Sequence, residues 1–387
     1  MKVLIVSKTQ THPIHAGNCR FILNQVELLK SLGHDVHFLF IETRGFSRKY
    51  ANMQKEIEEM KAYWKDHLYV YRQSRFQMLK TILLVKWRLL SNNGYTKCDD
   101  YYPSGLSSYT KKLNDIHHFD CCIINYYILS KLFVNVRFPL EAVTTHDYFG
   151  FKNVLIGGGK RSWMATTPNE EGKALQRCSH IFALNTEEAS YFSKLSPKST
   201  VYNVFSTYSY NSVPLTNNKV LLFMGAGGEL NLHGLQWFLN DIFPAIVKRF
   251  PDVRLKIAGT ICKLLKDNRD PHIDLVGFVE NEADFYKLGD VAVNPTFEGT
   301  GLKIKTFESI AYDKVVMVHP HSTIGIYKPE EAPIFSSIDA NEWVSFLEKV
   351  WGNENEIMRF KENNRRYIEE MNSFVYSEYK RFFGSYC

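Results

Sequence analysis

The stretch NPTFEGTGLKIKTFESIAYDKVVMVHP, residues 294–320, decides the fold. It starts at the end of an apolar run, turns through Gly299 and Gly301, continues with helical spacing and closes with the apolar run VVMV. This order of strand, glycine turn, helix and strand predicts one repeat of a parallel, doubly wound sheet. Ligands of such sheets bind where a strand ends and the next helix begins.

The same alternation extends in both directions from this stretch and predicts an α/β fold. At the N-terminus, the strand KVLIV, the periodic helix NCRFILNQVELLKSLG and the strand HDVHFLFIE form a βαβ unit. Residues 206–218 break both periodicities and are rich in Ser and Asn, which is typical of a linker. We therefore predict two Rossmann-like doubly wound domains, residues 1–207 and 216–370, followed by a terminal helix, 371–387, that packs back on the first domain.

Length and composition narrow the function classes. At 387 residues the chain exceeds one ordinary core, which favours two domains. The net charge of +6 is too small and too evenly spread for a nucleic-acid-binding protein. Seven cysteines without a C-x-x-C pair, an N-terminal apolar run of only four residues and no long apolar segment together predict a cytoplasmic protein with reduced thiols.

Residues 44–118 fit the alternation poorly and are expected to form a mainly helical insertion. Within it, the segment RFQMLKTILLVKWRLL, residues 75–90, combines Trp, Leu and Lys. On a helical wheel Lys80, Lys86 and Arg88 point in three separate directions, which favours a partly buried helix. A surface for a lipid or an acceptor is the alternative.

The opening stretch places Lys303 and Lys305 at the start of a helix, where a cation opposes the helix dipole. A bound anion would reverse that penalty, and the glycines before the helix would let a ligand approach the free N–H groups. Glu308, one turn beyond Lys305, could accept hydrogen bonds from a vicinal diol such as a ribose. The alternative is an exposed Lys305–Glu308 pair with Lys303 in solvent.

These residues carry a resemblance to a known family. The segment FEGTGLKIKTFESIAYDKVV resembles the donor-nucleotide segment of glycosyltransferases of family four in the GT-B superfamily, in the variant with a G-T-G-x-x-x-K-x-x-E motif. Thr300 stands eight residues before Glu308, where the commoner pattern has a glutamate. The segment FMGAGGELNLHGLQWFLNDIFPAI is similar to the first strand, glycine turn and helix of the family's C-terminal domain. The resemblance implies the following donor-binding residues: Gly225, Asn231, Thr300, Gly301, Leu302, Lys303, Lys305 and Glu308.

Two loops of the N-terminal half are also candidates. Gly17 would let the loop after the first strand pass close to a ligand. His146 and Asp147 end a strand at its carboxyl edge, and the family often has a histidine in this neighbourhood, so we assign both a catalytic role. A structural histidine bonded to the backbone is the alternative. Glu170 and Glu171, in the run TPNEE, are predicted to open a helix.

The resemblance implies a GT-B architecture with the two domains facing across a cleft. It implies a retaining glycosyltransferase that moves a sugar from a nucleotide-diphosphate donor to a glycan or lipid-linked acceptor, without a metal or other cofactor, in surface polysaccharide or glycoconjugate assembly. Peripheral contact with the inner membrane surface would suit such an acceptor. A sugar-nucleotide epimerase of the same fold and a non-catalytic scaffold remain as alternatives, and no metal site is evident because the histidines are scattered.

Overall fold

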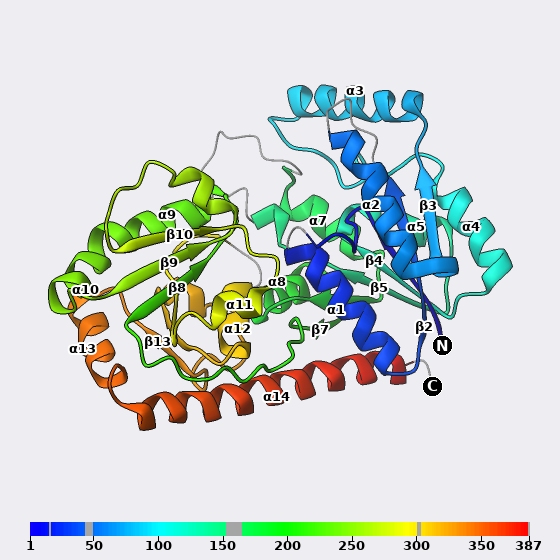
Figure 1. The fold of residues 1–387 in the computed structure, drawn as a ribbon. Helices are drawn as coiled ribbons and strands as arrows, with labels where there is room; N and C mark the ends of the chain where they lie inside the picture. The colour runs from blue at the N-terminus through cyan, green and yellow to red at the C-terminus, as the bar shows by residue number, and fades with distance from the viewer. Residues whose placement is uncertain (15–16, 43–48, 152–164, 300–302, 386–387) are drawn as a thin grey trace. The chain divides into compact units, whose positions relative to one another are not determined.

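The computed structural model describes residues 1–14, 17–42, 49–151, 165–299 and 303–385. The chain divides into two compact units: the first holds residues 1–207 and 375–387, the second residues 208–374. Each unit is an open sheet covered by helices (Figure 1).

The sheet of the first unit has seven parallel strands in the order β3-β2-β1-β4-β5-β6-β7. Their bounds are β1 Lys2–Ser7, β2 Asp35–Glu42, β3 Leu68–Arg72, β4 Cys121–Asn125, β5 Leu140–Thr144, β6 His180–Ala183 and β7 Thr200–Asn203. The strand order reverses between β1 and β4, and ligands bind at the carboxyl ends of the strands beside such a switch point.

Successive side chains of each strand point to opposite faces of this sheet. On one face the core is built from Leu4, Val6 and their neighbours together with the helices α4, α5, α7 and α8. On the other face Phe38 stacks on Trp64 of α2, and Phe182 contacts Phe382 of the C-terminal helix. The helices of this unit are α1 Gly17–Ser31, α2 Lys49–Trp64, α3 Arg75–Ser91, α4 Leu106–His117, α5 Lys131–Asn135, α7 Pro168–Leu175 and α8 Thr186–Leu195, with short 3-10 turns η1 Lys65–His67 and η2 Tyr127–Leu129.

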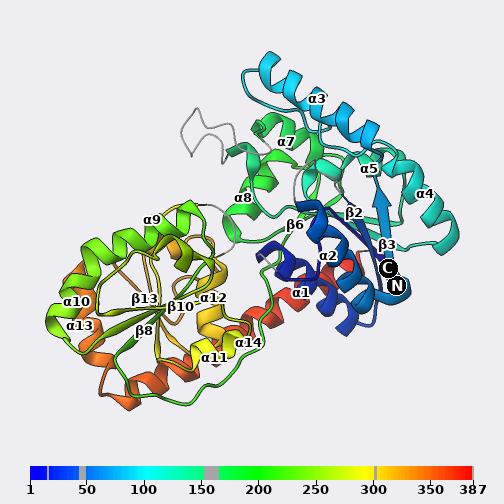
Figure 2. The same cartoon turned by 45° about the horizontal axis from the view of Figure 1, so that its top comes forward.

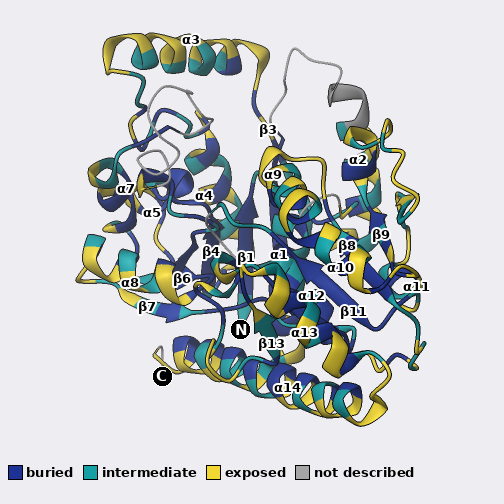
Figure 3. Ribbon diagram, turned by 90° about the vertical axis from the view of Figure 1, so that its left-hand side faces the viewer, coloured by how far each residue is buried: buried dark blue, intermediate teal, exposed yellow. Residues whose placement is uncertain are grey.

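The expected insertion is not purely helical. Its segment LYVYR forms β3, which pairs in parallel with β2 in the register Phe38↔Leu68 and completes the edge of the sheet. The strand spans only five residues between two helices, so its alternation is too short to stand out in the sequence. Figure 3 shows α3 apart from the sheet, with exposed residues along its outer side.

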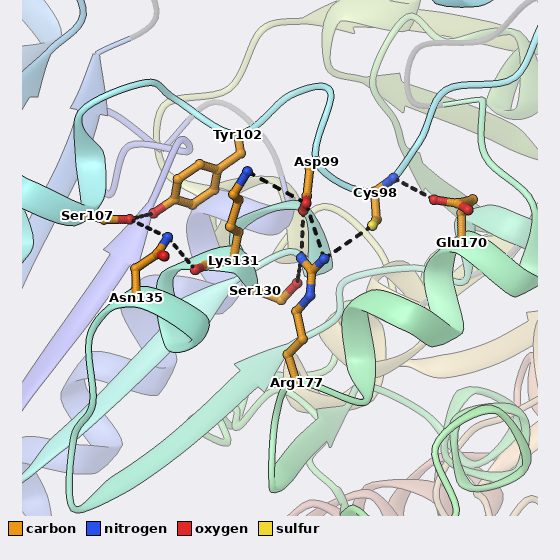
Figure 4. A network of polar contacts seen from close by, with 9 residues as sticks. All are labelled: Cys98, Asp99, Tyr102, Ser107, Ser130, Lys131, Asn135, Glu170 and Arg177. Atoms are coloured by element: carbon orange, nitrogen blue, oxygen red, sulfur yellow. Dashed lines mark hydrogen bonds and ion pairs between the residues drawn. The ribbon is translucent and has the colours of Figure 1, made fainter.

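The second half of the insertion is fastened by a polar network (Figure 4). Arg177 donates to both carboxylate oxygens of Asp99, at 2.6 and 3.1 Å. Lys131 lies 3.8 Å from the same carboxylate. Tyr102 and Asn135 both hydrogen-bond Ser107, at 2.6 and 3.0 Å. The segment 98–107 is therefore tied to α5 and to the end of α7.

The sheet of the second unit has six parallel strands in the order β10-β9-β8-β11-β12-β13. Their bounds are β8 Val220–Met224, β9 Arg254–Ala258, β10 Ile273–Gly277, β11 Val291–Asn294, β12 Val315–Val318 and β13 Ile334–Ser336. The sequence prediction lacked β13, which has only three residues. Here the order reverses between β8 and β11.

Helices cover both faces of this second sheet (Figure 2). Leu221 and Phe223 face a core with α9, α10 and α13, whereas Val220 and Leu222 face α11 and its neighbours. The helices are α9 Glu229–Trp237, α10 Phe243–Arg249, α11 Glu282–Tyr286, α12 Ile304–Ala311 and α13 Ala340–Val350, with the π-helical turn η3 Phe238–Ile242 and the 3-10 turns η4 Thr260–Leu264 and η5 Pro320–Thr323.

The final helix, α14 Glu354–Gly384, is continuous over 31 residues. Residues 354–374 belong to the second unit and residues 375–384 to the first. The expected boundary at 370/371 therefore falls inside one helix. Within the first unit, the Tyr379 hydroxyl accepts a hydrogen bond from Gln25 Nε2 at 2.8 Å, which anchors the end of this helix to α1.

The irregular segment that opens the second unit is held by two buried carboxylates. Asp290 accepts from the backbone N–H and the hydroxyl of Thr216, at 3.0 and 2.7 Å, and from the N–H of Asn217 at 3.0 Å. Asp313 accepts from the hydroxyl of Tyr210 at 2.7 Å and pairs with the buried Lys361 at 2.9 Å. The segment predicted as a linker is therefore packed against the second unit and held there by hydrogen bonds.

We expect Asp290→Ala to lower the free energy of unfolding by about 3 kcal/mol, because the donors of Thr216 and Asn217 would lose their charged acceptor. Urea denaturation followed by circular dichroism measures the change. The control is Asp267→Ala, an exposed carboxylate of the same unit. Equal stability of the two variants would contradict the role of Asp290.

Candidate functional site

The carboxyl end of β8 leads into a glycine turn and the start of α9. Gly228 occupies the position before the helix, and no side chain caps it. Asn231, in the first turn of α9, donates from Nδ2 to the carbonyl oxygen of Ala226 at 2.9 Å. Gly259 follows β9 with φ +96°, and a side chain there would collide with Gly225, since an added Cβ would lie 2.2 Å from the Gly225 carbonyl oxygen. The turn is therefore built against a second glycine that the sequence prediction did not single out.

Lys305 connects this turn to the second strand-end loop. It lies in the first turn of α12, and its ammonium donates to Asn231 Oδ1 at 2.6 Å. Lys303 occupies the position before the helix and donates to the carbonyl oxygen of Gly299 at 3.3 Å. No side-chain hydrogen bond caps α12 within the part of the chain that the structure describes. Two cations and two uncapped helix starts therefore meet at the switch point of this sheet.

The loop after β11 is held by hydrogen bonds from the 3-10 turn η5 and by the close approach of α9. His321 Nε2–H donates to the Gly299 carbonyl oxygen at 2.8 Å, and the Ser322 hydroxyl donates to the Thr296 carbonyl oxygen at 2.8 Å. Gly234 lets α9 approach this loop, because an added Cβ would lie 2.8 Å from the Pro295 carbonyl oxygen. The 3-10 turn after β12 and the helix after β8 thus fix the loop between them.

These elements surround one pocket of about 190 Å³. It is lined by Leu230, Asn231, Asn294, Thr296, Glu298, Gly299, Lys303, Ile304, Lys305 and Ser322. Among the described residues, the buried Asn294 Oδ1 and Thr296 hydroxyl oxygen have no hydrogen-bond partner. The pocket therefore offers two cations, uncapped helix N–H groups and unused neutral polar atoms.

The pocket lowers the pKa of Lys305. Burial is the main cause and brings the pKa to about 8; the charge of Lys303 acts in the same direction, whereas Glu308 acts against it. Glu298 lies at 3.4 Å from His233 Nδ1 and is the carboxylate of the pocket lining. An anion that entered beside Lys305 would raise its pKa again, because a nearby negative charge favours the protonated ammonium.

The structure brings together three of the predicted donor residues, Asn231, Lys303 and Lys305, in the lining of this pocket. Gly225 lies in the turn behind Asn231, and Glu308 lies one helical turn beyond Lys305, outside the lining. Thr300, Gly301 and Leu302 lie outside the described residues.

Three polar residues that line the pocket were not predicted from the sequence: Asn294, Thr296 and Ser322. Asn294 is a buried polar residue at the end of the predicted strand, and its Nδ2 donates to the Thr306 hydroxyl at 2.9 Å. A polar residue at the carboxyl end of a strand is the sequence signal that could have identified it. Ser322 reaches the pocket from a separate turn, which no spacing in the sequence indicates.

In the first unit, His146 follows β5 with φ 68° and is packed among aromatic side chains. Its ring stacks on Tyr126 at 4.5 Å between centroids and meets the edge of Phe21 at 5.5 Å. Its Nε2–H donates to Asn125 Oδ1 at 2.6 Å, because an amide oxygen can only accept. Burial lowers the pKa of His146 to about 3, so the ring is neutral at physiological pH. The remaining nitrogen, Nδ1, is then a hydrogen-bond acceptor.

Asp147 sits beside two buried glutamates that hold the same loop. Glu171 accepts from the N–H groups of Phe149 and Gly150, at 2.9 and 3.0 Å. Glu188 accepts from the Thr145 hydroxyl at 3.2 Å. Burial, reinforced by the Asp147 charge, raises the pKa of Glu171 to about 7 and that of Glu188 to about 8.

The prediction that Glu170 and Glu171 open a helix is confirmed, since both lie in the first turn of α7 after the cap Thr167. Gly17 is the first residue of α1. The neighbouring Asn18 donates to the Tyr126 hydroxyl at 2.8 Å and so links α1 to the aromatic group around His146.

One histidine cluster departs from the expectation that the histidines are scattered. Asp35 accepts from His37 Nε2 at 3.2 Å and from His67 Nε2 at 3.0 Å, and the three ligand atoms lie within 4.8 Å of one another. His37 is the third residue of β2 and His67 directly precedes β3, and the two rings meet because the residues that follow them, Phe38 and Leu68, are paired in register. These residues lie at the amino ends of β2 and β3, the edge opposite His146, and the two hydrogen bonds to Asp35 account for their arrangement.

Comparisons with known proteins agree with this geometry. Residues 218–352, which carry the whole pocket, match the family described as Glycosyl transferases group 1. The chain is 23% identical over 337 residues to an uncharacterized 44.6 kDa protein in the cps region of Klebsiella pneumoniae, covering 80% of each chain.

Solved structures establish the architecture. TarM superimposes with a TM-score of 0.67 at 10% identity, covering 99% of this chain and 98% of that one, and a mutant form of S. aureus TarM is known in a complex that contains UDP. Anabaena HepE in complex with UDP superimposes with a TM-score of 0.65 at 10% identity, covering 99% and 100%. The chain has the GT-B fold, and the match to the group 1 glycosyltransferase family lies within its second unit.

The structure contains no helix, within its described part, that is long and apolar enough to cross a membrane. The six described cysteines are buried, and none of them forms a disulfide with another described cysteine.

We expect the His146 ring resonances to stay constant in NMR spectra between pH 8 and pH 4.5. The folded pKa of about 3 lies below the value of an unfolded histidine, so this group costs no stability above pH 6.5 and lowers stability progressively as the pH falls below that value. His146→Gln identifies the resonances and should flatten this part of the acid dependence. A His146 resonance that titrates near pH 6.5 would contradict the buried, neutral ring.

Proposed function

We propose that the protein is a retaining glycosyltransferase that takes a sugar from a nucleoside-diphosphate donor bound in the pocket of the second unit. The observation that carries the proposal is the Lys305 ammonium, held by Asn231 against the uncapped start of α12. A partly buried cation at the positive end of a helix is unfavourable by itself. A diphosphate at this place would neutralise Lys303 and Lys305 and would accept from the helix N–H groups.

The donor diphosphate would lie between the starts of α9 and α12. Asn231 and Lys305 would then orient it from one side and Lys303 from the other. Glu308, one helical turn beyond Lys305, would hold the ribose hydroxyls in this proposal. Thr300, Gly301 and Leu302 belong to the same motif and complete the proposed donor loop. The named complexes of HepE and TarM with UDP support a uridine nucleotide as the first ligand to test.

In the reaction, the bond between the anomeric carbon and the diphosphate oxygen breaks, and a bond to an acceptor hydroxyl oxygen forms on the same face of the sugar. The acceptor proton passes to the departing diphosphate, whose charge Lys303, Lys305 and the helix start stabilise. These groups supply the charge balance without a metal in this proposal. His146 and Asp147 are proposed to contact the donor sugar or the acceptor, with His146 acting as a neutral group.

The similarity to a cps-region protein supports an acceptor in surface polysaccharide or glycoconjugate assembly, either a glycan or a lipid-linked sugar. Epimerisation of the donor by the same fold is the second candidate. Incubation of a nucleotide sugar with and without acceptors, followed by analysis of the products, separates the two: transfer requires an acceptor, whereas epimerisation does not.

We expect Lys305→Ala to weaken UDP binding by about 30-fold, because one charge-assisted hydrogen bond to a phosphate is lost. Lys349→Ala removes an exposed lysine of α13 in the same unit and should leave the affinity unchanged. Isothermal titration calorimetry measures both, after a thermal-shift panel of UDP, GDP, ADP and CDP has identified the base. If Lys305→Ala combined with Glu308→Ala bound the nucleotide as tightly as the wild type, the site assignment would be wrong.

The affinity for the nucleotide should also depend on pH in a defined direction. Lys305, with a pKa of about 8 in the free protein, carries its charge fully at pH 6.5 and loses it as the pH rises above 8. Binding should therefore weaken between pH 7 and pH 9.5. Lys305→Arg keeps the charge over this range and should remove most of that dependence. A pH profile that is identical in both proteins would show that another group titrates.

A further inference from the structure

The helix α3 carries an apolar surface that the first unit does not cover. Its side chains Phe76, Leu83, Trp87 and Leu90 are exposed by 78%, 59%, 57% and 75%, and Leu79 is also exposed. They follow one another at intervals of 3, 4, 4 and 3 residues in the order 76, 79, 83, 87 and 90. At 3.6 residues per turn, this spacing places all five on one outward face (Figure 3), which we call the α3 outer face.

The opposite side of α3 is already docked on the first unit. Met78 is buried, and Ile82, Val85 and Leu89 are partly buried. Arg88 turns to this inner side and pairs with the buried Asp100 at 3.3 Å. The helix starts with a capping box between Ser74 and Gln77. The helix thus already packs on the first unit through its opposite side, and the α3 outer face is a second, separate apolar surface.

Charge distinguishes the outer face from an ordinary apolar patch. The sequence of α3 has no acidic residue and four basic ones. With Arg88 turned inward, the exposed Arg75, Lys80 and Lys86 remain, and no ion pair with a described residue engages them. On the helical wheel Lys80 borders the apolar arc on one side, and Lys86 and Arg75 border it on the other.

The three directions expected for Lys80, Lys86 and Arg88 thus have a structural explanation. Arg88 belongs to the protein side, and the two lysines flank the apolar arc. Long basic side chains beside an apolar arc can extend to phosphate headgroups while the apolar residues enter the acyl boundary. Trp87 has the amphipathic ring that favours this boundary.

We propose that the α3 outer face docks the protein on a membrane surface that contains anionic lipids. Pairing of two α3 helices is disfavoured, because each would bring only positive charges to the other. A membrane offers both a continuous apolar layer and negative headgroups, which match the two components of this face. The inference rests on α3 alone and does not depend on the proposed glycosyl transfer, although docking would bring a lipid-linked acceptor to the protein.

The test is flotation of the full chain with vesicles of 70% phosphatidylcholine and 30% phosphatidylglycerol, compared with pure phosphatidylcholine. Wild-type protein should float with the anionic vesicles and bind the neutral ones more weakly. Leu83→Glu combined with Trp87→Glu should abolish flotation. Lys80→Gln combined with Lys86→Gln should weaken binding by about 25-fold at low salt, roughly fivefold for each lysine.

The matched control is Ile116→Glu combined with Val134→Glu, which introduces the same charges at two other exposed apolar positions of the first unit, on α4 and α5. It should float like the wild type. Flotation of the α3 variant equal to that of this control would overturn the proposal. So would a wild-type dimer that ignores vesicles and becomes monomeric in the α3 variant, which would assign the face to a second copy of the chain.

Circular dichroism and the thermal shift with UDP should be the same for the wild type and the α3 variant, because α3 lies in the other unit from the donor pocket. Failure of UDP, GDP, ADP and CDP alike to bind any of these proteins would contradict the proposed function and leave the flotation result standing. Failure of flotation with normal UDP binding would contradict only the membrane proposal.

Discussion

The hydrogen bond from Lys305 to Asn231 joins the two strand-end loops on which the second unit's site depends. It can form only because α9 approaches the loop after β11 closely enough, at Gly234, and because Gly225 lies against Gly259. Among the described residues, no carboxylate forms an ion pair with this partly buried lysine, which is an unusual arrangement for stability. Its lowered pKa records that cost, and an anionic ligand is the simplest group that would remove it.

The parallel sheets explain why so much of the fold can be predicted from the sequence. Strands such as β1 and β8 are buried on both faces and appear as continuous apolar runs, each followed by a glycine, a helix and another run. The strands that were missed, β3 and β13, lie at sheet edges and have five and three residues. At an edge, one neighbour is missing and a short strand needs little apolar sequence, so the pattern that identifies central strands is absent.

The site was predictable to the extent that its chemistry is local. Lys303 and Lys305 could be chosen because glycines and a helix start stand beside them in the sequence, and the family resemblance added Asn231. Ser322 joins them only through the packing of a separate turn, which no local sequence pattern indicates. For His146, the position at the end of a strand could be predicted from the sequence, but its environment could not. The aromatic contacts with Tyr126 and Phe21 and the hydrogen bond to Asn125 come from other segments of the chain.

Two ion pairs fix the position of α3 in the insertion between β2 and β4. Arg177–Asp99 fixes the segment after α3 to the body of the first unit, and Arg88–Asp100 fixes α3 to that segment. These two ion pairs hold α3 with one face inward. A helix that only filled space would gain from polar residues on its outer face, because exposed apolar side chains favour aggregation. The five apolar residues of the α3 outer face, flanked by basic residues, are therefore better explained by a surface that receives them than by packing within the chain.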